Sequence, residues 1–294
     1  MAVFSDPSFD SHEQVVFGAD RSSGLRAIIA VHDTRLGAAV GGCRMYPYVS
    51  EAEAIDDVLR LSRGMTYKSA LAGLPLGGGK SVIIGDPKEH KSDALWRAMA
   101  KFIDSLGGRY VAAEDSGTSV ADLRAMSQHT DHVSGFAATE HGGDPSPSTA
   151  LGVFVGIRAA LAHRLGSSDF QSVRVAIQGL GHVGFALAQM LKSAGAEVIA
   201  SDINPANLAR AVDELGVTPV ASDDILFADV DVLAPCALGG ALNAESIAGL
   251  RAGIIAGAAN NQLREAADGD RLVDRGILYC PDFLINAGGI IDVY

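Results

Sequence analysis

The stretch at residues 65–87 reads Met-Thr-Tyr-Lys-Ser-Ala-Leu-Ala-Gly-Leu-Pro-Leu-Gly-Gly-Gly-Lys-Ser-Val-Ile-Ile-Gly-Asp-Pro. It holds two lysines, Lys68 and Lys80, and the second follows three glycines and enters an apolar, strand-like run. The glycines permit a bend with positive φ and the close approach of a small molecule or another backbone. Two lysines in such a bend would leave one amine neutral near pH 7, where it can act as a general base. Taken alone, a lysine after glycines is more often a solvated loop residue.

The composition indicates an α/β protein of about two domains. Of the 294 residues 48% are hydrophobic, only 6% are aromatic and 34 are glycines, which is typical of an α/β chain with a large core and many small packing residues. Acidic residues outnumber basic ones by 35 to 23. This balance argues against a nucleic-acid or anionic membrane surface, but it allows a small anionic substrate held by a few lysines.

Cysteine and histidine spacing argues against disulfides and metal sites. Cys43, Cys236 and Cys280 form no CxxC pair, and the eight histidines show no HExxH spacing. We therefore expect no metal and a reducing, cytoplasmic location. The N-terminus lacks the charged and apolar regions of a signal peptide, and no apolar run is long enough to cross a bilayer, so no membrane association is expected.

Hydrophobic spacing predicts alternating strands and helices around the central stretch. A capping-box pattern at Ser50–Glu53 begins a helix that carries Met65 and Lys68 toward its C-terminal end. A second helix should end at Gly107–Gly108. Strands are expected at residues 26–33, 37–45, 82–84 and 109–113, and the last of these leads into Glu114-Asp115. Open α/β sheets usually bind their ligands just past the carboxyl ends of strands, and this acidic pair is expected at such a position.

A glycine- and proline-rich segment at residues 142–147 predicts the domain boundary, because two prolines within three residues block both helix and strand. Ser148 should then cap a helix that runs to about His163. The predicted domains are residues 1–146, for substrate binding, catalysis and oligomerisation, and residues 147–285, for nucleotide binding. Residues 286–294 are expected to return toward the first domain.

The second half carries a nucleotide-binding pattern. An apolar strand at 173–178 leads into a GxGxxG loop, with a helix expected at 185–194 and a strand at 197–201 that Asp202 closes. In such a loop the first glycine allows the tight turn, the second lets the backbone reach the pyrophosphate and the third lets helix and strand pack closely. The context of strand, helix and acid makes the motif specific. Its residues are Gly179, Leu180, Gly181, His182, Val183 and Gly184, of which His182 is expected to have no catalytic role.

Asp202 should accept hydrogen bonds from the adenosine ribose and repel a 2′-phosphate, which favours NAD over NADP. Its neighbour Ile203 belongs to the same predicted cofactor site. The alternative is that Asp202 only caps the helix that begins near Pro205. Two later strands, at 230–234 and 254–258, end in loops that hold Ala237-Leu238 and Asn260-Asn261. These loops could contact the nicotinamide or the substrate, or they could be ordinary turns.

Seven motifs in this order resemble the glutamate/leucine/phenylalanine/valine dehydrogenase family, and specifically its branch for neutral amino acids. They run across nearly the whole chain: Gly41-Gly42-Cys43-Arg44-Met45, Arg63 to Lys68, Leu74 to Pro87, Glu114 to Thr118, the GxGxxG loop, Pro235 to Gly239, and Asn286-Ala287-Gly288-Gly289. The resemblance implies two domains with a cleft between them, an α/β substrate domain and a Rossmann-type NAD-binding domain. It also implies a homo-oligomer, a dimer or an octamer, and family members continue past the end of this chain.

The resemblance further implies residue roles. Lys68 would bind the substrate α-carboxylate, Lys80 would be the general base, and Asp115 would exchange protons with the substrate nitrogen. Asn261 would hold the amino group. Thr149, Ala237, Leu238 and Asn260 would contact the cofactor. Gly41 and Gly42 would line the substrate site.

The implied activity is the reversible NAD-dependent oxidative deamination of a neutral amino acid to its 2-oxo acid and ammonia. Glutamate-specific members carry a lysine immediately before the Gly-Gly pair, where this chain has Val40. An apolar residue there would leave a distal carboxylate unpaired, so we expect glutamate to be rejected. The expected pocket wall is Val40, Met65, Ala113, Ile290 and Val293.

Leucine, valine or isoleucine is the first choice of substrate and phenylalanine or tryptophan the second, since single-methylene differences discriminate by only about 1–3 kcal/mol. A glutamate dehydrogenase and an inactive NAD-binding regulatory paralogue remain as further alternatives.

Overall fold

The computed structural model describes residues 3–135, 144–237 and 239–293. Two compact units, Met1–Asp144 and Pro145–Asp292, make up the chain apart from its last two residues. The expectation of a two-domain α/β protein with a Rossmann-type sheet is confirmed. The fold assigns residues 286–292 to the second unit, and a separate role for residues 286–294 remains a prediction.

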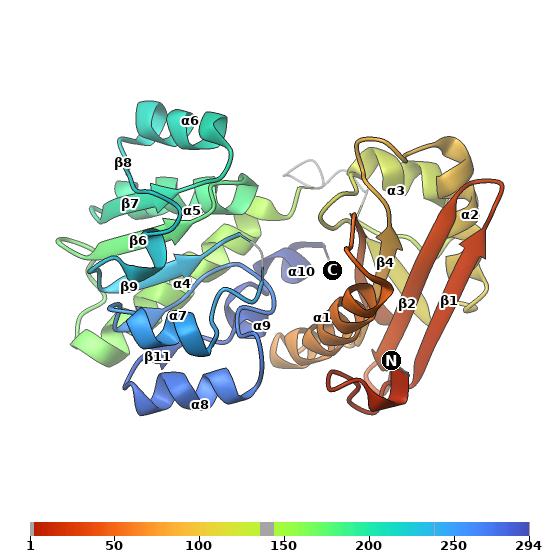
Figure 1. The fold of residues 1–294 in the computed structure, drawn as a ribbon, viewed down its shortest axis with the longest axis horizontal. Coiled ribbons are helices and arrows are strands. Elements are labelled where there is room, and N and C mark those ends of the chain that lie inside the picture. The colour runs from red at the N-terminus through yellow and green to blue at the C-terminus, as the bar shows by residue number, and fades with distance from the viewer. Residues whose placement is uncertain (1–2, 136–143, 238, 294) are drawn as a thin grey trace. The chain divides into compact units, whose positions relative to one another are not determined.

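Unit 1 is built on a five-stranded mixed sheet with the order β1-β2-β4-β3-β5, in which β3 is parallel to β4 and β5 while β2 is antiparallel to β1 and β4. Its elements (Figure 1) are η1 (Val3–Ser5), β1 (Gln14–Asp20), β2 (Leu25–Asp33), β3 (Ala39–Tyr46), α1 (Glu51–Leu71), β4 (Gly77–Ile84), α2 (Asp93–Asp104), β5 (Tyr110–Ala113) and α3 (Val120–Ser127).

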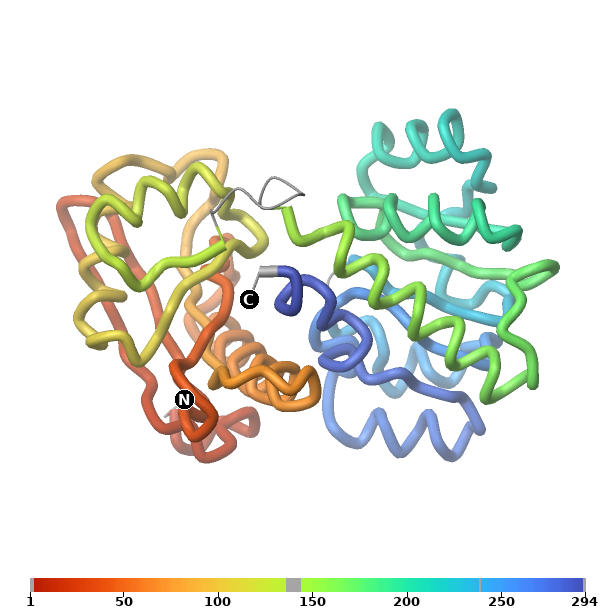
Figure 2. Tube along the Cα trace, turned by 180° about the vertical axis from the view of Figure 1, so that it is seen from behind, coloured from red at the N-terminus to blue at the C-terminus, as the bar shows by residue number. Residues whose placement is uncertain are grey.

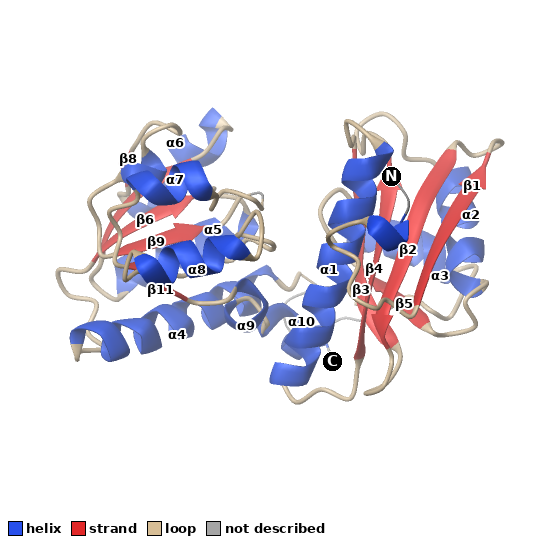
Figure 3. Cartoon of the chain, turned by 60° about the horizontal axis from the view of Figure 1, so that its bottom comes forward, coloured by secondary structure: helices blue, strands red, loops and turns tan. Residues whose placement is uncertain are grey.

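Helices cover both faces of this sheet. Helix α1 packs on one face through a cluster that includes Ile55, Val58 and Leu59, and α2 and α3 pack on the other (Figure 3). Helix α1 begins where the capping-box pattern predicts, since the Ser50 side chain accepts a hydrogen bond from the Glu53 backbone N–H.

Unit 2 is built on a six-stranded parallel sheet with the order β11-β10-β9-β6-β7-β8. Its elements are α4 (Ser146–Leu165), β6 (Arg174–Gln178), α5 (His182–Ser193), β7 (Glu197–Ser201), α6 (Pro205–Leu215), β8 (Thr218–Pro219), η2 (Ile225–Phe227), β9 (Val232–Pro235), α7 (Ala244–Gly249), β10 (Ile254–Ile255), α8 (Ala267–Asp274), β11 (Leu278–Tyr279), α9 (Asp282–Ile285) and α10 (Gly288–Val293).

The order of this sheet reverses at β6, which pairs with β7 on one side and β9 on the other. Open parallel sheets bind ligands at such a switch point, outside the carboxyl ends of the strands. Helices α4 and α5 pack together over one face (Figure 2). Elements η2, α7 and α8 pack on the other face through a hydrophobic cluster that includes Ile225, Ile247 and Leu272. The described helices include none that is long and apolar enough to cross a membrane.

Three predicted element boundaries were wrong. The glycines at 77–79 begin strand β4 and none of them has positive φ, so they form no bend. Helix α4 begins at Ser146 and holds Pro147 in its first turn, where a missing N–H is tolerated, so the prolines do not block the helix and Ser148 lies inside it without capping it. Helix α5 begins at His182 rather than at residue 185, because the chain enters the helix directly from Gly181.

Candidate active site

In place of a bend, the glycines of β4 allow close packing. A Cβ on Gly78 would lie 2.1 Å from Thr66 Oγ1 and 2.2 Å from Thr66 N, and a Cβ on Gly79 would lie 2.7 Å from the Tyr110 ring. Only glycine lets α1 lie this close to β4. The last turn of α1, which carries Lys68, is therefore held against the strand that carries Lys80.

Lys80 is buried, with only 3% of its surface exposed, and its Nζ donates a hydrogen bond to Asp115 Oδ2 as an ion pair. Burial lowers the pKa of Lys80 below its usual range, although the Asp115 carboxylate opposes the shift. Arg44 on β3 is a like charge that lowers this pKa further. The mutual depression expected of Lys68 and Lys80 remains a prediction. Arg44 lies in the Gly41–Met45 motif, but no role was predicted for it from the sequence.

Asp115 is the centre of a charged cluster. Arg44 Nε donates to Asp115 Oδ1 at 2.9 Å, and the Ser116 backbone N–H donates to the same oxygen at 2.7 Å. Burial disfavours the carboxylate, but the Arg44 and Lys80 charges outweigh it and hold the pKa of Asp115 well below its usual range. Because Nζ and Oδ2 are hydrogen-bonded, a proton can pass between Lys80 and Asp115 without water.

A tight turn after β5 aims Asp115 at this cluster. The Thr118 N–H donates to the Asp115 carbonyl at 2.9 Å, and Thr118 Oγ1 donates to the Cys43 carbonyl at 2.9 Å. Gly117 has a φ of +83°, and a Cβ there would lie 1.9 Å from the Met45 carbonyl oxygen. The Glu114–Thr118 motif is thus the turn that ties Asp115 to β3.

The other predicted residues of unit 1 lie on β3, on β5 and on helix α1. Gly41 is buried on β3, and a Cβ there would lie 1.7 Å from the Gly79 carbonyl oxygen. Gly42 pairs in register with Ala113 of β5, and its Cβ would meet Asp115. Val40, half-buried, pairs with Gly78 of β4. Met65, also half-buried, lies one turn before Lys68 on α1.

In unit 2 the GxGxxG loop joins β6 to α5 at the switch point. Gly179 has a φ of +95°, and a Cβ there would lie 2.9 Å from the Ala237 Cβ, so the loop after β9 packs beside it. A Cβ on Gly184 would lie 2.0 Å from the Gly179 carbonyl oxygen. Gly181, by contrast, is exposed with nothing within 4 Å of its Cβ position.

This loop is suited to an anion. Gly181 is the N-cap of α5 and provides no side chain to cap the first helical N–H groups, which makes the helix N-terminus a site for a phosphate. His182 is exposed and Val183 half-buried at the start of the helix. The residues present therefore fit a dinucleotide.

Asp202 contacts both the loop and the first turns of the next helix, without being the N-cap of that helix. Its Oδ2 accepts a hydrogen bond from the Leu180 N–H at 2.6 Å and its Oδ1 accepts one from the Asn204 N–H at 2.7 Å. Asn204 caps α6 by accepting from the Ala206 N–H, so the alternative that Asp202 only caps that helix is wrong. Ile203 beside it is 91% exposed.

The Asn286–Gly289 motif packs against the start of α4. A Cβ on Gly288 would lie 1.9 Å from the Ser148 carbonyl oxygen, and one on Gly289 would lie 2.6 Å from Thr149 Oγ1. Asn286 Nδ2 donates to Asn260 Oδ1 at 2.8 Å, while Asn286 Oδ1 is buried with no hydrogen-bond partner among the residues that the structure describes. The motif thus packs beside Thr149 and hydrogen-bonds Asn260, two predicted cofactor residues.

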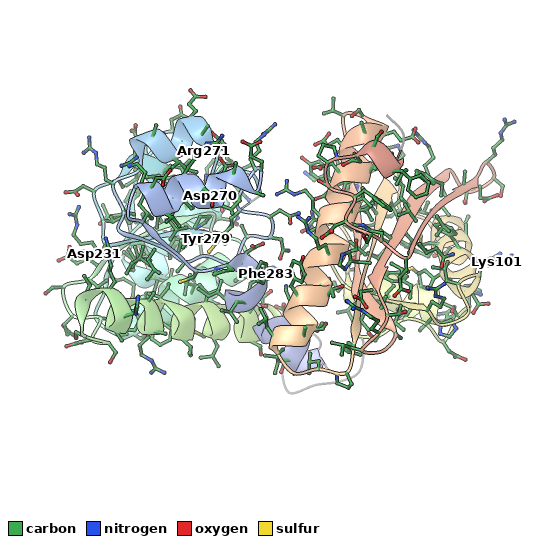
Figure 4. The ribbon with its side chains drawn as sticks, turned by 90° about the horizontal axis from the view of Figure 1, so that it is seen from below. Lys101, Asp231, Asp270, Arg271, Tyr279 and Phe283 are labelled. Atoms are coloured by element: carbon green, nitrogen blue, oxygen red, sulfur yellow. The ribbon has the colours of Figure 1, made fainter. Side chains whose placement is uncertain are left out.

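Asn261 has a positive φ of 52°, and its N–H donates to Asp282 Oδ2 at 2.6 Å. The Tyr279 hydroxyl donates to the other oxygen of Asp282 at 3.2 Å (Tyr279 is labelled in Figure 4). Ile290 is buried on α10. Leu238 and the Val293 side chain lie outside the described residues. No group of three or more His, Cys, Asp or Glu side chains within the described ranges is placed to hold a metal ion.

Comparison with known proteins identifies the family to which this chain belongs. Residues 12–132 match the Glu/Leu/Phe/Val dehydrogenase dimerisation domain, and residues 143–206 and 203–294 match the Glutamate/Leucine/Phenylalanine/Valine dehydrogenase domain. The chain is 50% identical to leucine dehydrogenase of Geobacillus stearothermophilus over 295 residues, which cover 100% of this chain and 80% of that protein.

Solved structures agree. The crystal structure of L-tryptophan dehydrogenase from Nostoc punctiforme is similar with a TM-score of 0.75 and 46% identity, over 97% of this chain and 81% of that one. The hetero-hexameric glutamate dehydrogenase from Thermus thermophilus is similar with a TM-score of 0.76 and 25% identity, over 96% and 75%. The chain therefore belongs to the Glu/Leu/Phe/Val dehydrogenase family and is an amino-acid dehydrogenase.

Proposed function

We propose that this enzyme catalyses the reversible, NAD-dependent oxidative deamination of a neutral, apolar L-amino acid, with leucine, valine or isoleucine preferred. The products are the 2-oxo acid and ammonia. The observation that carries the proposal is the buried Lys80 paired with Asp115, because it is a proton-transferring pair with a lysine of lowered pKa.

The residues of unit 1 would divide the work as follows. Lys68 binds the substrate α-carboxylate. Lys80 takes a proton from the water that attacks the imine carbon, and Asp115 exchanges protons with the substrate nitrogen as ammonia leaves. Asn261 of unit 2 holds the substrate amino group. This reaction needs a fixed cation that binds the carboxylate, and groups that exchange protons with the substrate nitrogen as its charge changes.

The nucleotide would be held by unit 2. Its pyrophosphate would rest on the loop at Gly179–Gly184 and the N-terminus of α5, and its adenosine ribose on Asp202, with Thr149, Ala237 and Asn260 as further contacts. When bound, NAD accepts the hydride that leaves the substrate Cα. A carboxylate at residue 202 would repel a 2′-phosphate, which supports NAD over NADP.

Val40 supports the choice of an apolar substrate. It stands before Gly41 and Gly42, where glutamate-specific members of the family carry a lysine, and it is half-buried. A glutamate side chain there would be desolvated without a partner, which costs about 3–5 kcal/mol. The 50% identity to a leucine dehydrogenase supports the same choice.

We also propose a homo-oligomer, a dimer or an octamer, and a cytoplasmic location. A hexameric assembly of one relative supports oligomerisation. The free thiols of Cys43, Cys236 and Cys280 fit a reducing compartment. Sedimentation of the purified protein as a single-subunit species would refute the first statement.

A substrate panel tests the function. NADH and NADPH formation is followed with leucine, valine, isoleucine, phenylalanine, tryptophan and glutamate at equal concentrations. We expect the highest kcat/KM with a branched aliphatic substrate and NAD, and none measurable with glutamate. A preference for phenylalanine or tryptophan would move the enzyme to the aromatic branch. Turnover of glutamate alone would refute the proposal, as would NAD binding with no turnover of any amino acid.

A further inference from the structure

Arg44 connects the Lys80–Asp115 pair to a second carboxylate on helix α1. Its Nε donates to Asp115 Oδ1, while its Nη1 donates to Asp57 Oδ2, both at 2.9 Å. Arginine's planar, forked guanidinium can hold two carboxylates in this way, whereas lysine's point charge cannot. The Arg44 side chain is only 16% exposed, and those of Asp115 and Asp57 are 12% and 22% exposed. The contacts are therefore shielded from water and from salt.

Asp57 is itself held in place. Tyr48, in the loop that joins β3 to α1, donates its hydroxyl to Asp57 Oδ2 at 2.7 Å. Asp57 thus accepts two hydrogen bonds on one oxygen, from Arg44 and Tyr48. The hydrogen bonds that link Tyr48, Asp57, Arg44 and Asp115 join a loop, a helix, a strand and the turn after β5. Only the contact between Tyr48 and Asp57 is between residues close in sequence.

We propose that Arg44, anchored by Asp57, is a positioning residue that holds the Asp115 carboxylate and sets the pH range in which the Lys80–Asp115 pair works. The proposal rests on the proposed function. Each oxygen of Asp115 faces one cation, Lys80 on Oδ2 and Arg44 on Oδ1. Arg44 therefore competes with Lys80 for the same carboxylate and also repels the Lys80 ammonium.

Three other titratable groups near the pair, one cysteine and two tyrosines, have raised pKa values and stay neutral near pH 7. Burial raises the pKa of the Cys43 thiol on β3 to about 12. Burial also raises the pKa values of Tyr48 and of Tyr110 on β5. Besides Asp115, two charges that act on Lys80 are Arg44, which lowers its pKa, and Asp57, which raises it.

These two charges act on Lys80 with opposite signs, and this makes the proposal testable. Removal of the Arg44 charge raises the pKa of Lys80, so the neutral amine forms only at higher pH. Removal of the Asp57 charge lowers the pKa of Lys80, so the neutral amine forms at lower pH. A neighbouring charge shifts a pKa by about 1–3 units. Lys68 on the same helix and Glu114 beside Asp115 are left unchanged in the experiment.

The experiment compares pH profiles of kcat/KM for leucine in the intact enzyme and in Arg44→Met and Asp57→Asn. The ascending limb should move to higher pH by about one unit in Arg44→Met, which is about a tenfold loss at a fixed pH on the limb, and to lower pH in Asp57→Asn. Arg35→Met is the matched control, because Arg35 is 86% exposed and pairs only with Asp33 among the ion pairs described; its limb should stay in place.

A second measurement needs no turnover. The lysine ε-carbon signals are titrated by 13C NMR in the enzyme without substrate, and the Lys80 signal is assigned by its absence in Lys80→Arg. Its midpoint should rise in Arg44→Met and fall in Asp57→Asn. If these shifts appear but no amino acid is turned over, the proposed function fails and the arrangement stands. Loss of activity by the same factor at every pH, with unchanged midpoints of the Lys80 titration, would overturn the proposal. If Arg44→Met does not fold, the isosteric Asp57→Asn variant provides the test.

Discussion

The two units build their sites from different materials. Unit 1 places charged side chains out of water, where Lys80, Asp115 and Arg44 satisfy one another. Unit 2 offers a backbone loop in which the three glycines Gly179, Gly181 and Gly184 have no side chains. A site made of buried charges depends on every partner and on pH, because an unpaired buried charge is costly. A site made of backbone N–H groups needs glycines, whose missing side chains leave room for the ligand. Its N–H groups do not titrate, so they bind in the same way at any physiological pH.

The largest expected effect concerns the packing that underlies the charged site. In Gly41→Ala the new Cβ would meet the Gly79 carbonyl oxygen at 1.7 Å, so β3 and β4 must move apart beside Lys80. We expect a loss of about 3 kcal/mol or more in the free energy of unfolding, and loss of most activity. Urea unfolding and kcat measure the two effects.

Gly64→Ala in helix α1 is the matched control, because the space around its Cβ is open. Alanine is the better helix former by up to about 1 kcal/mol, so this variant should be as stable as the parent or more so. Equal stability of Gly41→Ala and the parent would contradict the predicted clash between the new Cβ and the Gly79 carbonyl oxygen.

The next effect sharpens the contrast in pH dependence. His12 is buried in unit 1, with Nε2 3.0 Å from the Leu59 carbonyl oxygen and from Ser62 Oγ, and burial lowers its pKa from 6.5 to about 4. A histidine with a lowered folded pKa stabilises the fold fully above pH 6.5, and this contribution is lost as the pH falls from 6.5 toward 4. His12 alone should cost about 2 kcal/mol between pH 7 and pH 5.

Fluorescence of Trp96, the single tryptophan of the chain and buried in the core of unit 1, reports this unfolding. His12→Asn should remove most of the difference between the two pH values. Among the described residues, every histidine or carboxylate with a shifted pKa belongs to unit 1. An unchanged difference in His12→Asn would place the pH dependence elsewhere.

The smallest effect separates two glycines of the loop in unit 2. Gly181 has a φ of −64° and open space at its Cβ, so Gly181→Ala should fold as the parent does. Its methyl group would occupy the face proposed for the pyrophosphate, and we expect a rise of about tenfold in the Kd for NAD, which is about 1.4 kcal/mol. Calorimetric titration measures it.

Gly184→Ala is the counterpart. Its Cβ would lie 2.0 Å from the Gly179 carbonyl oxygen, so it should lower the melting temperature of unit 2 as well as NAD binding. If Gly181→Ala bound NAD as tightly as the parent, the loop would not hold the cofactor.

The sequence predicted what local rules decide. Ser50 caps α1 and the GxGxxG loop follows a strand and leads into a helix, because both patterns act over a few residues. Rules of this kind failed at residues 77–79, where the glycines serve packing against Thr66 and Tyr110 in place of a turn. Local spacing cannot tell a glycine needed for a bend from one needed for a neighbour.

The charged network escaped prediction for a related reason. Arg44 and Asp115 are 71 residues apart, and Arg44 and Asp57 lie on different elements whose packing no local pattern reveals. The family motif pointed to Lys80 and Asp115 but gave no signal for Asp57 or Tyr48. The mutual effect expected of Lys68 and Lys80 remains a prediction, and Arg44 is a further like charge that lowers the pKa of Lys80.

The most direct test of Lys80 as the base is the steady-state kcat for NADH formation by Lys80→Met at saturating leucine and NAD, because imine hydrolysis must finish before the next turnover begins. The account predicts a rate about 100- to 10,000-fold below that of the parent, with NAD binding unchanged. Lys101→Met serves as the control, because Lys101 is exposed on α2 (labelled in Figure 4), and it should react at the parent rate. A Lys80→Met enzyme that formed NADH as fast as the parent would contradict the assignment of Lys80 and with it the proposed chemistry.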